Sequence, residues 1–221
     1  MIELGKTQPL TATCALGLER VLADELRALG AEAVAPDRGS VLFAGDLRTV
    51  YNVNIRLRTA MRVLAPLVRG PVSNRNELYE LASSVAWGEV LKTGQTFAVE
   101  VVGKHRSFRN TTFAGQVVKD AVVDRLRSAG GRRPNVDREN PEIRLHLRLV
   151  EDGPVTLSID SSGEPLSHRG YRPRGGPAPL AETLAAGILL LAGYDGSEPL
   201  LDPMCGTGTF AVEAALIATR T

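Results

Sequence analysis

The sequence has few cysteines and histidines, and each shortage excludes a class of protein. Only two of its 221 residues are cysteines, Cys14 and Cys205, and they lie far apart without the spacing of a metal site or a disulfide framework. The three histidines, His105, His146 and His168, share no ligand spacing either. We therefore predict free thiols, surface or structural roles for the histidines, and no bound metal.

Long hydrophobic runs are also missing. The longest apolar stretch, residues 184–193, is well short of the roughly 20 residues that a membrane helix needs. The first 17 residues, MIELGKTQPLTATCALG, have no apolar core after a basic head, so they do not resemble a secretory signal. We expect a cytoplasmic protein with no membrane partner.

Charge is strongly segregated, although the formal net charge is only +1. Residues 48–75 contain six arginines and no acidic residue, and residues 101–138 contain nine basic and three acidic residues. Local basic blocks on a nearly neutral protein can attract phosphate groups. Solvated surface faces produce the same pattern, so the blocks alone leave both interpretations open.

The first seventy residues have the pattern of a small α/β domain. Leu18, Leu22, Leu26 and Leu29 recur at helical spacing, and Gly30 follows them as a stop signal. The expected order of elements is βαββαβ, which is the ferredoxin-like arrangement. Its members are a strand at 10–15, a helix at 17–29, strands at 31–35 and 40–44, a helix near 47–57 and a strand at 61–68.

A second α/β unit follows without an obvious linker. We expect a helix at 77–91, a strand at 96–102, a helix at 116–129 and a hairpin of strands 144–150 and 155–160. In the first hairpin strand three leucines alternate with Arg144, His146 and Arg148. Those three side chains either face solvent or extend a basic surface.

The stretch from 161 to 179 is rich in Gly, Pro, Arg and Ser, and this composition predicts a linker. Its Arg169, Arg172 and Arg174 either contact a phosphate-bearing partner or brace two domains. After the linker we expect a helix at 180–191, a short strand at 199–202 and a helix from 209.

The most specific motif is LLDPMCGTGTFAVEAALIA, residues 200–218. A strand ends at Asp202 and runs into Gly206-Thr207-Gly208, where the missing side chains let backbone approach a ligand. The next helix directs its N–H groups and dipole at the turn. Three interpretations remain: a dinucleotide fingerprint, an S-adenosylmethionine motif, or a turn without a ligand. The Asp-Pro step favours the second, because a ligand with an ammonium and a ribose suits a nearby carboxylate.

With these residues in place, the chain resembles the front half of THUMP-containing methyltransferases, and most of all the bacterial large-subunit ribosomal RNA guanine-N2 enzymes. The likeness extends from GLERVLADELRALGA through LRTVYNVNIRLRTAMRVL, VVKDAVVDRL, RPNVDREN, LSIDSSGEPLSHRGYR and APLAETLAAGILL to LLDPMCGTGT. It implies an α+β chain with a ferredoxin-like domain at 1–69 and a THUMP α/β domain at 70–160, whose profile boundary could start near 44. A linker at 161–179 and the first strand and helices of a truncated Rossmann-like methyltransferase domain at 180–221 would follow.

The resemblance also implies S-adenosylmethionine as the cofactor. Its site residues in this sequence would be Asp202, Cys205, Gly206, Gly208 and Thr209, with Pro179 and Leu180 at the methionine end. The Asn/Asp-Pro-Pro-aromatic turn that holds the target amine in the family does not occur here, so the catalytic residues are unknown. One strand and one helix cannot form a parallel sheet. We therefore expect a fragment that does not methylate by itself.

RNA, most of all large-subunit ribosomal RNA, is the expected partner. Phe108 and Phe113 flank the basic loop and either stack on bases or belong to the core. The alternatives are a fragment that acts on tRNA or on adenine in DNA, and a stand-alone RNA-binding module. The hypothesised RNA contacts are Lys104, Arg106, Arg109, Asn110, Lys119, Arg132, Arg133 and Arg138.

Overall fold

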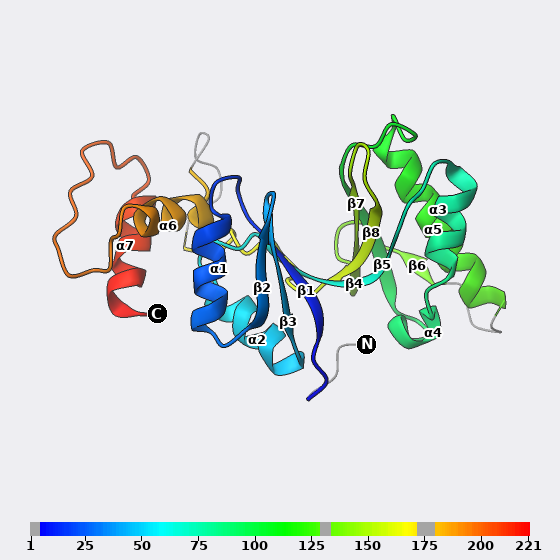
Figure 1. Ribbon diagram of the computed structural model, residues 1–221, viewed down its shortest axis with the longest axis horizontal. Helices are drawn as coiled ribbons and strands as arrows, with labels where there is room; N and C mark the ends of the chain where they lie inside the picture. Colours follow the sequence, from blue (N-terminus) through cyan, green and yellow to red (C-terminus); the bar gives the residue numbers. More distant parts are fainter. Residues whose placement is uncertain (1–4, 129–133, 172–179) are drawn as a thin grey trace. The chain divides into compact units, whose positions relative to one another are not determined.

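The computed structural model describes residues 5–128, 134–171 and 180–221. The chain divides into two compact units, which we describe separately (Figure 1). The central unit consists of residues 64–161. The terminal unit combines residues 5–63 with residues 162–171 and 180–221, so that segments far apart in the sequence fold together.

The terminal unit contains the expected βαββαβ series, which confirms a ferredoxin-like order. Strand β1 pairs antiparallel with β3, and β3 pairs antiparallel with β2. The Met61 N–H donates to the carbonyl of Thr13 at 2.7 Å and so places the start of β4 beside the end of β1. The elements are β1 (Gln8–Thr13), α1 (Glu19–Ala28), β2 (Glu32–Asp37), β3 (Ser40–Gly45), α2 (Leu47–Arg56) and β4 (Arg62–Gly70), which continues into the central unit.

Apolar periodicity explains these elements. Leu10 and Ala12 alternate toward the core on β1, and helix α1 buries Leu22 and Leu26 one turn apart. Helix α2 begins at a capping residue, because the Asp46 carboxylate accepts the Thr49 N–H at 3.0 Å.

The terminal unit also holds helices α6 (Glu182–Leu191) and α7 (Thr209–Thr219). The two helices pack together around Leu189, Ala214 and Ile217. Helix α6 also contacts α1, where the buried Gly187 lies against Leu18. The expected strand at 199–202 is wrong, since this segment is irregular. A strand needs neighbouring backbone partners, and the described part of the chain offers none to these residues.

The central unit is a sheet in the order β4-β8-β7-β5-β6. Strand β5 is parallel to β6 and β7, whereas β7 and β8 form the expected antiparallel hairpin. Helices α3 and α5 pack against each other on the sheet (Figure 1). The remaining elements are α3 (Arg75–Ser83), α4 (Trp87–Val90), β5 (Thr96–Gly103), α5 (Thr111–Ser128), β6 (Asn135–Val136), β7 (Ile143–Leu149) and β8 (Val155–Asp160).

Three expectations for the central unit need correction. The single helix at 77–91 is instead α3 and α4, which are separated at residues 84–86. Helix α5 begins at Thr111 rather than 116, because the Asn110 side-chain oxygen accepts the N–H groups of Thr112 and Phe113 and starts the helix there. His146 is 5% exposed, so it does not face solvent as the alternation with leucines had predicted.

Among the described residues, none of the helices combines the length and the apolar character that a bilayer-spanning segment requires.

The contact between α6 and α1 leads to a stability prediction. A Cβ on Gly187 would overlap the Leu18 side chain, so Gly187→Ala must displace a buried leucine. We expect overpacking to exceed the intrinsic helix gain of alanine and to lower the free energy of unfolding by about 1–3 kcal/mol. Urea denaturation measures this change. Gly88→Ala is the control, because nothing lies within 4 Å of its added Cβ. A Gly187→Ala chain as stable as its parent would contradict the prediction.

Candidate functional site

The glycine turn, which we define as residues 202–209, is the first candidate site. Gly206 and Gly208 have φ angles of +50° and +77°, values that side chains other than glycine rarely adopt. A Cβ at either position would meet no atom within 4 Å, so the backbone is open to a ligand. The Gly208 N–H donates to the Cys205 carbonyl at 2.7 Å and closes the turn ahead of α7. The residue before helix α7 is thus Gly208, which has a left-handed backbone conformation and no side chain to cap the helix.

The hydrogen bonding of Asp202 indicates what kind of ligand this turn could bind. Its Oδ1 accepts the Met204 N–H at 3.0 Å, whereas its Oδ2 is buried and has no hydrogen-bond partner among the described residues. A buried carboxylate oxygen normally has a donor, so this atom is suited to a ligand that brings one. The residues present therefore fit a ligand with hydroxyl or ammonium donors.

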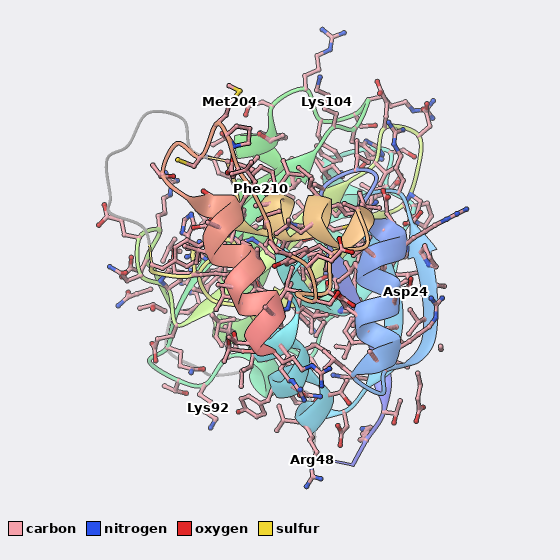
Figure 2. All side chains as sticks on the ribbon, turned by 90° about the vertical axis from the view of Figure 1, so that its left-hand side faces the viewer. Asp24, Arg48, Lys92, Lys104, Met204 and Phe210 are labelled. Atoms are coloured by element: carbon pink, nitrogen blue, oxygen red, sulfur yellow. The ribbon has the colours of Figure 1, made fainter. Side chains whose placement is uncertain are left out.

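The other residues expected at this site differ in exposure. Cys205 is an exposed free thiol, and its neighbour Met204 is 90% exposed at the tip of the turn (Figure 2). Thr209 is buried at the start of α7, and Leu180 is half-buried two residues before α6. Pro179 lies outside the described residues.

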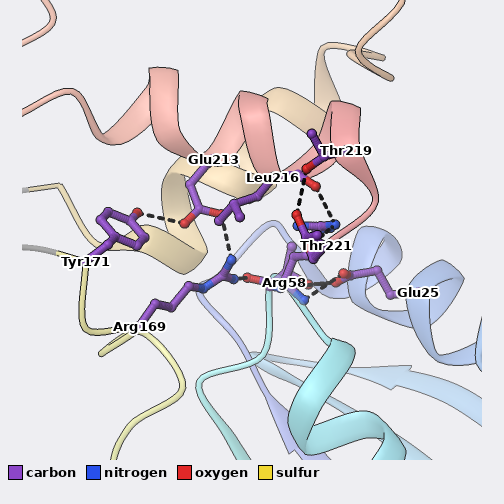
Figure 3. A network of polar contacts seen from close by, with 9 residues as sticks. Glu25, Arg58, Arg169, Tyr171, Glu213, Leu216, Thr219 and Thr221 are labelled. Carbon is purple, nitrogen blue, oxygen red and sulfur yellow. Dashed lines mark hydrogen bonds and ion pairs between the residues drawn. The ribbon is translucent and has the colours of Figure 1, made fainter.

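A buried carboxylate that sequence reasoning missed lies on α7. Glu213 is fully buried, and its two oxygens accept hydrogen bonds from Arg169 Nη1 and the Tyr171 hydroxyl, each at 2.7 Å (Figure 3). Burial raises the pKa of Glu213, and the hydrogen bond from Tyr171 and the charge of Arg169 oppose that shift. Arg169 therefore makes a bracing contact inside the terminal unit, and its contact with RNA stays a prediction. The sequence did contain an indication of this carboxylate, because Glu213 is the one charged residue in the segment TFAVEAALIAT. Arg172 and Arg174 are outside the described residues.

The second candidate site is the α5 groove, a depression of about 380 Å³ in the central unit. It combines Lys119 of α5 with Arg138 and Arg144, and Glu100 is its one acidic member. The parallel register of β5 and β7 sets Ala98 opposite Arg144 and so brings this arginine into the groove. The lining residues are Ala98, Val99, Glu100, Val101, Thr111, Thr112, Gly115, Gln116, Lys119, Val136, Arg138 and Arg144.

The structure divides the hypothesised RNA contacts into groups. Lys119 and Arg138 line the groove, whereas Lys104, Arg106 and Arg109 are exposed on the loop after β5 and do not line it. Figure 2 shows Lys104 projecting from its loop. Arg106 Nη1 lies 3.5 Å from Asp152 Oδ1, an exposed pair that contributes little to stability. Asn110 caps α5, and Arg132 and Arg133 lie outside the described residues.

The two phenylalanines beside the loop have different environments. Phe108 is 3% exposed and belongs to the core of the central unit, so the stacking interpretation is wrong for it. The buried His105 ring packs against Phe108 with 5.5 Å between the centroids. Phe113 is 43% exposed and stays a candidate for stacking.

In the part of the chain that the structure describes, no three His, Cys, Asp or Glu side chains are grouped so that they could hold a metal ion.

Comparison with known families accounts for almost the whole chain. Residues 9–64 match the RlmL ferredoxin-like domain, residues 72–160 match the THUMP domain, and residues 169–221 match the RMKL-like methyltransferase domain. In chain order, the sequence is therefore similar to a ferredoxin-like domain, a THUMP domain and part of a methyltransferase domain.

Proteins named ribosomal RNA large subunit methyltransferase K/L are similar to this chain. The one from Colwellia psychrerythraea is 41% identical over 97% of the chain, and the one from Pseudomonas aeruginosa is 45% identical over 95% of it. The chain spans only 30% and 29% of these two relatives.

Solved structures share the fold. A putative methyltransferase complexed with SAH is 32% identical with a TM-score of 0.83, and a predicted N6-adenine-specific DNA methylase from Listeria monocytogenes is 33% identical with a TM-score of 0.83. The match covers 97% of this chain and 56% of each of those chains.

The two thiols of this chain should react differently. Burial, followed by the charges of Glu19 and Glu25, raises the pKa of Cys14 to about 12, whereas Cys205 is exposed. Near pH 8 Cys14 stays protonated and covered, so a maleimide should modify one thiol rapidly in the native chain and two in urea. Mass spectrometry counts the adducts. A native Cys205→Ser chain should remain unmodified, and its rapid modification would show that Cys14 is accessible.

Proposed function

We propose that this chain is the RNA-binding and cofactor-loop portion of an S-adenosylmethionine-dependent methyltransferase that modifies a guanine N2 of large-subunit ribosomal RNA. The observation that carries the proposal is the buried Asp202 Oδ2, which lies at the open glycine turn and has no hydrogen-bond partner within the described part of the chain. The relatives named as ribosomal RNA methyltransferases and the neighbour complexed with SAH support the choice of substrate and cofactor.

Each part of the glycine turn has a role in this proposal. The cofactor, when bound, supplies a methyl group on a sulfonium. Asp202 accepts hydrogen bonds from its donors, and the bare backbone at Gly206 and Gly208 admits it closely. Cys205, Thr209, Leu180 and Pro179 complete the proposed site. The uncapped start of α7 favours the negative end of the ligand.

The α5 groove and the basic loop are the proposed RNA surface. Lys119, Arg138 and Arg144 neutralise phosphates in the groove, and Lys104, Arg106 and Arg109 do so from the loop. Arg132 and Arg133 belong to the same proposal. Phosphate contacts hold the RNA without reading its sequence.

The 221 residues contain no Asn/Asp-Pro-Pro-aromatic motif, and the described part has no parallel sheet next to the glycine turn. We therefore propose that transfer needs residues outside this sequence. The chain spans about 30% of its curated relatives, which agrees with that proposal.

A methyl-transfer assay on the full-length gene product tests the function. With radiolabelled S-adenosylmethionine we expect N2-methylguanosine in large-subunit ribosomal RNA, identified by nucleoside mass spectrometry. Asp202→Ala should reduce transfer by at least about tenfold, because a ligand donor loses its acceptor. The control is Asp195→Ala, since Asp195 is exposed and its carboxylate accepts hydrogen bonds from the N–H and the hydroxyl of Ser197.

The possible products separate the alternatives. Label in tRNA guanine or in DNA adenine would contradict the ribosomal assignment. RNA binding without any transfer would instead favour a stand-alone binding module.

Removing groove charges tests the RNA surface separately. Lys119→Ala combined with Arg138→Ala removes two cations from the α5 groove. Binding of a ribosomal RNA hairpin should weaken, and the slope of log affinity against log salt should fall by about two, because each phosphate contact releases counterions. Filter binding at several salt concentrations measures both quantities.

The matched control removes the same charge elsewhere. Arg75 and Arg127 are exposed and line a different groove between α3 and α5. Their double alanine variant should keep the slope of the parent. Equal slopes in all three proteins would exclude the α5 groove as an RNA-binding surface. The same measurement with Arg106→Ala and Arg109→Ala decides whether the basic loop binds RNA.

A further inference from the structure

Glu213 is unusual because a carboxylate lies at the centre of an apolar helix. It is 0% exposed, and its neighbours Ala214 and Ile217 belong to the apolar contact with α6. It follows Thr209, the last residue of the glycine turn, by about one helical turn. A buried charge of this kind persists only when paired and hydrogen-bonded.

Both partners of Glu213 come from one short segment of the chain. Arg169 Nη1 donates to one carboxylate oxygen and the Tyr171 hydroxyl donates to the other, each at 2.7 Å. The guanidinium of Arg169 is itself fixed, because Nη2 donates to the carbonyl of Arg58. Figure 3 shows the carboxylate between the two donors. Two directional bonds therefore join α7 to residues 169–171, and a third holds Arg169 against Arg58.

The contact is anchored further in the ferredoxin-like part of the terminal unit. Arg58 Nη2 donates to the carbonyls of Leu216 at 2.9 Å and Thr221 at 2.8 Å, at the C-terminal end of α7. The Arg58 N–H donates to Glu25 Oε1 at 2.8 Å, and the Thr59 N–H donates to Glu25 Oε2 at 3.1 Å. Helix α7 is thus held at its middle by Glu213 and at its end by Arg58 (Figure 3).

The geometry of the glycine turn depends on where α7 lies. The turn closes directly onto the helix through Gly208, whose carbonyl accepts the Val212 N–H at 2.9 Å. The turn itself is mostly exposed and has few side-chain bonds of its own. A shift of α7 would therefore move the open backbone of the turn as a unit.

We propose that Glu213, Arg169 and Tyr171 are positioning residues that hold α7, and with it the glycine turn, in the arrangement that receives the cofactor. They act through the helix and do not touch the ligand. This inference rests on the proposed function, because it assumes that the turn is a cofactor site.

The experiment compares conservative variants of the full-length gene product. Tyr171→Phe removes one hydroxyl and leaves a buried carboxylate oxygen without its donor, and Glu213→Gln removes the charge that faces Arg169. Calorimetric titration with S-adenosylhomocysteine, well below the unfolding temperature, should show about tenfold weaker binding for each variant, since small displacements of a preorganised site have large effects. Tyr51→Phe and Glu198→Gln are the matched controls, because both side chains are exposed.

A second measurement separates positioning from general stability. Hydrogen exchange without ligand should be faster at the amides of 205–210 in Tyr171→Phe, with unchanged exchange in the central unit and unchanged RNA affinity. If Glu213→Gln does not fold, Tyr171→Phe carries the test alone.

The outcomes distinguish the two proposals. A parent protein that does not bind S-adenosylhomocysteine overturns the proposed function and this inference together. If the parent binds and Tyr171→Phe binds equally well, with parental exchange at 205–210, only the inference is overturned. A lower melting temperature with unchanged affinity would mean a purely structural contact and would also overturn it.

Discussion

A carboxylate in an apolar helix requires a fixed set of donors, and the pairing of Glu213 with Arg169 and Tyr171 meets that requirement in the terminal unit. Without those donors, burial of the charge would oppose the packing of α7. With them, α7 has one favourable position, which Arg58 reinforces at the end of the helix. The arrangement of the glycine turn follows from this helix.

The proposed function gives the two units separate tasks. The central unit has a basic groove built on a parallel strand pair, whereas the terminal unit has an open turn with an acidic oxygen that has no hydrogen-bond partner among the described residues. These are different physical strategies. Counterion release in the groove needs only charge at the surface, but recognition at the turn needs backbone held in an unusual conformation.

Local patterns predicted most of the secondary structure. The leucine spacing of α1, the alternation in β7 and β8 and the βαββαβ order all depend on residues close in sequence. The failures have tertiary or capping causes. The strand expected at 199–202 lacks neighbouring strands, and Asn110 starts α5 earlier than the apolar pattern indicates. His146 is buried although it alternates with the leucines of β7, because packing of the whole unit decides what covers each face.

The sequence by itself determined the family resemblance, the Asp-Pro step and the glycines of the turn, because a motif is a property of adjacent residues. Only the tertiary structure decided which distant side chains meet. Arg169 could have faced RNA or a second domain until its bond to Glu213, 44 residues later, was seen. Arg144 lines the α5 groove because the register of β5 and β7 places it there. Phe108 is buried and therefore does not belong to an RNA-binding surface. Pairing across such separations depends on the packing of the whole unit, and no local pattern records it.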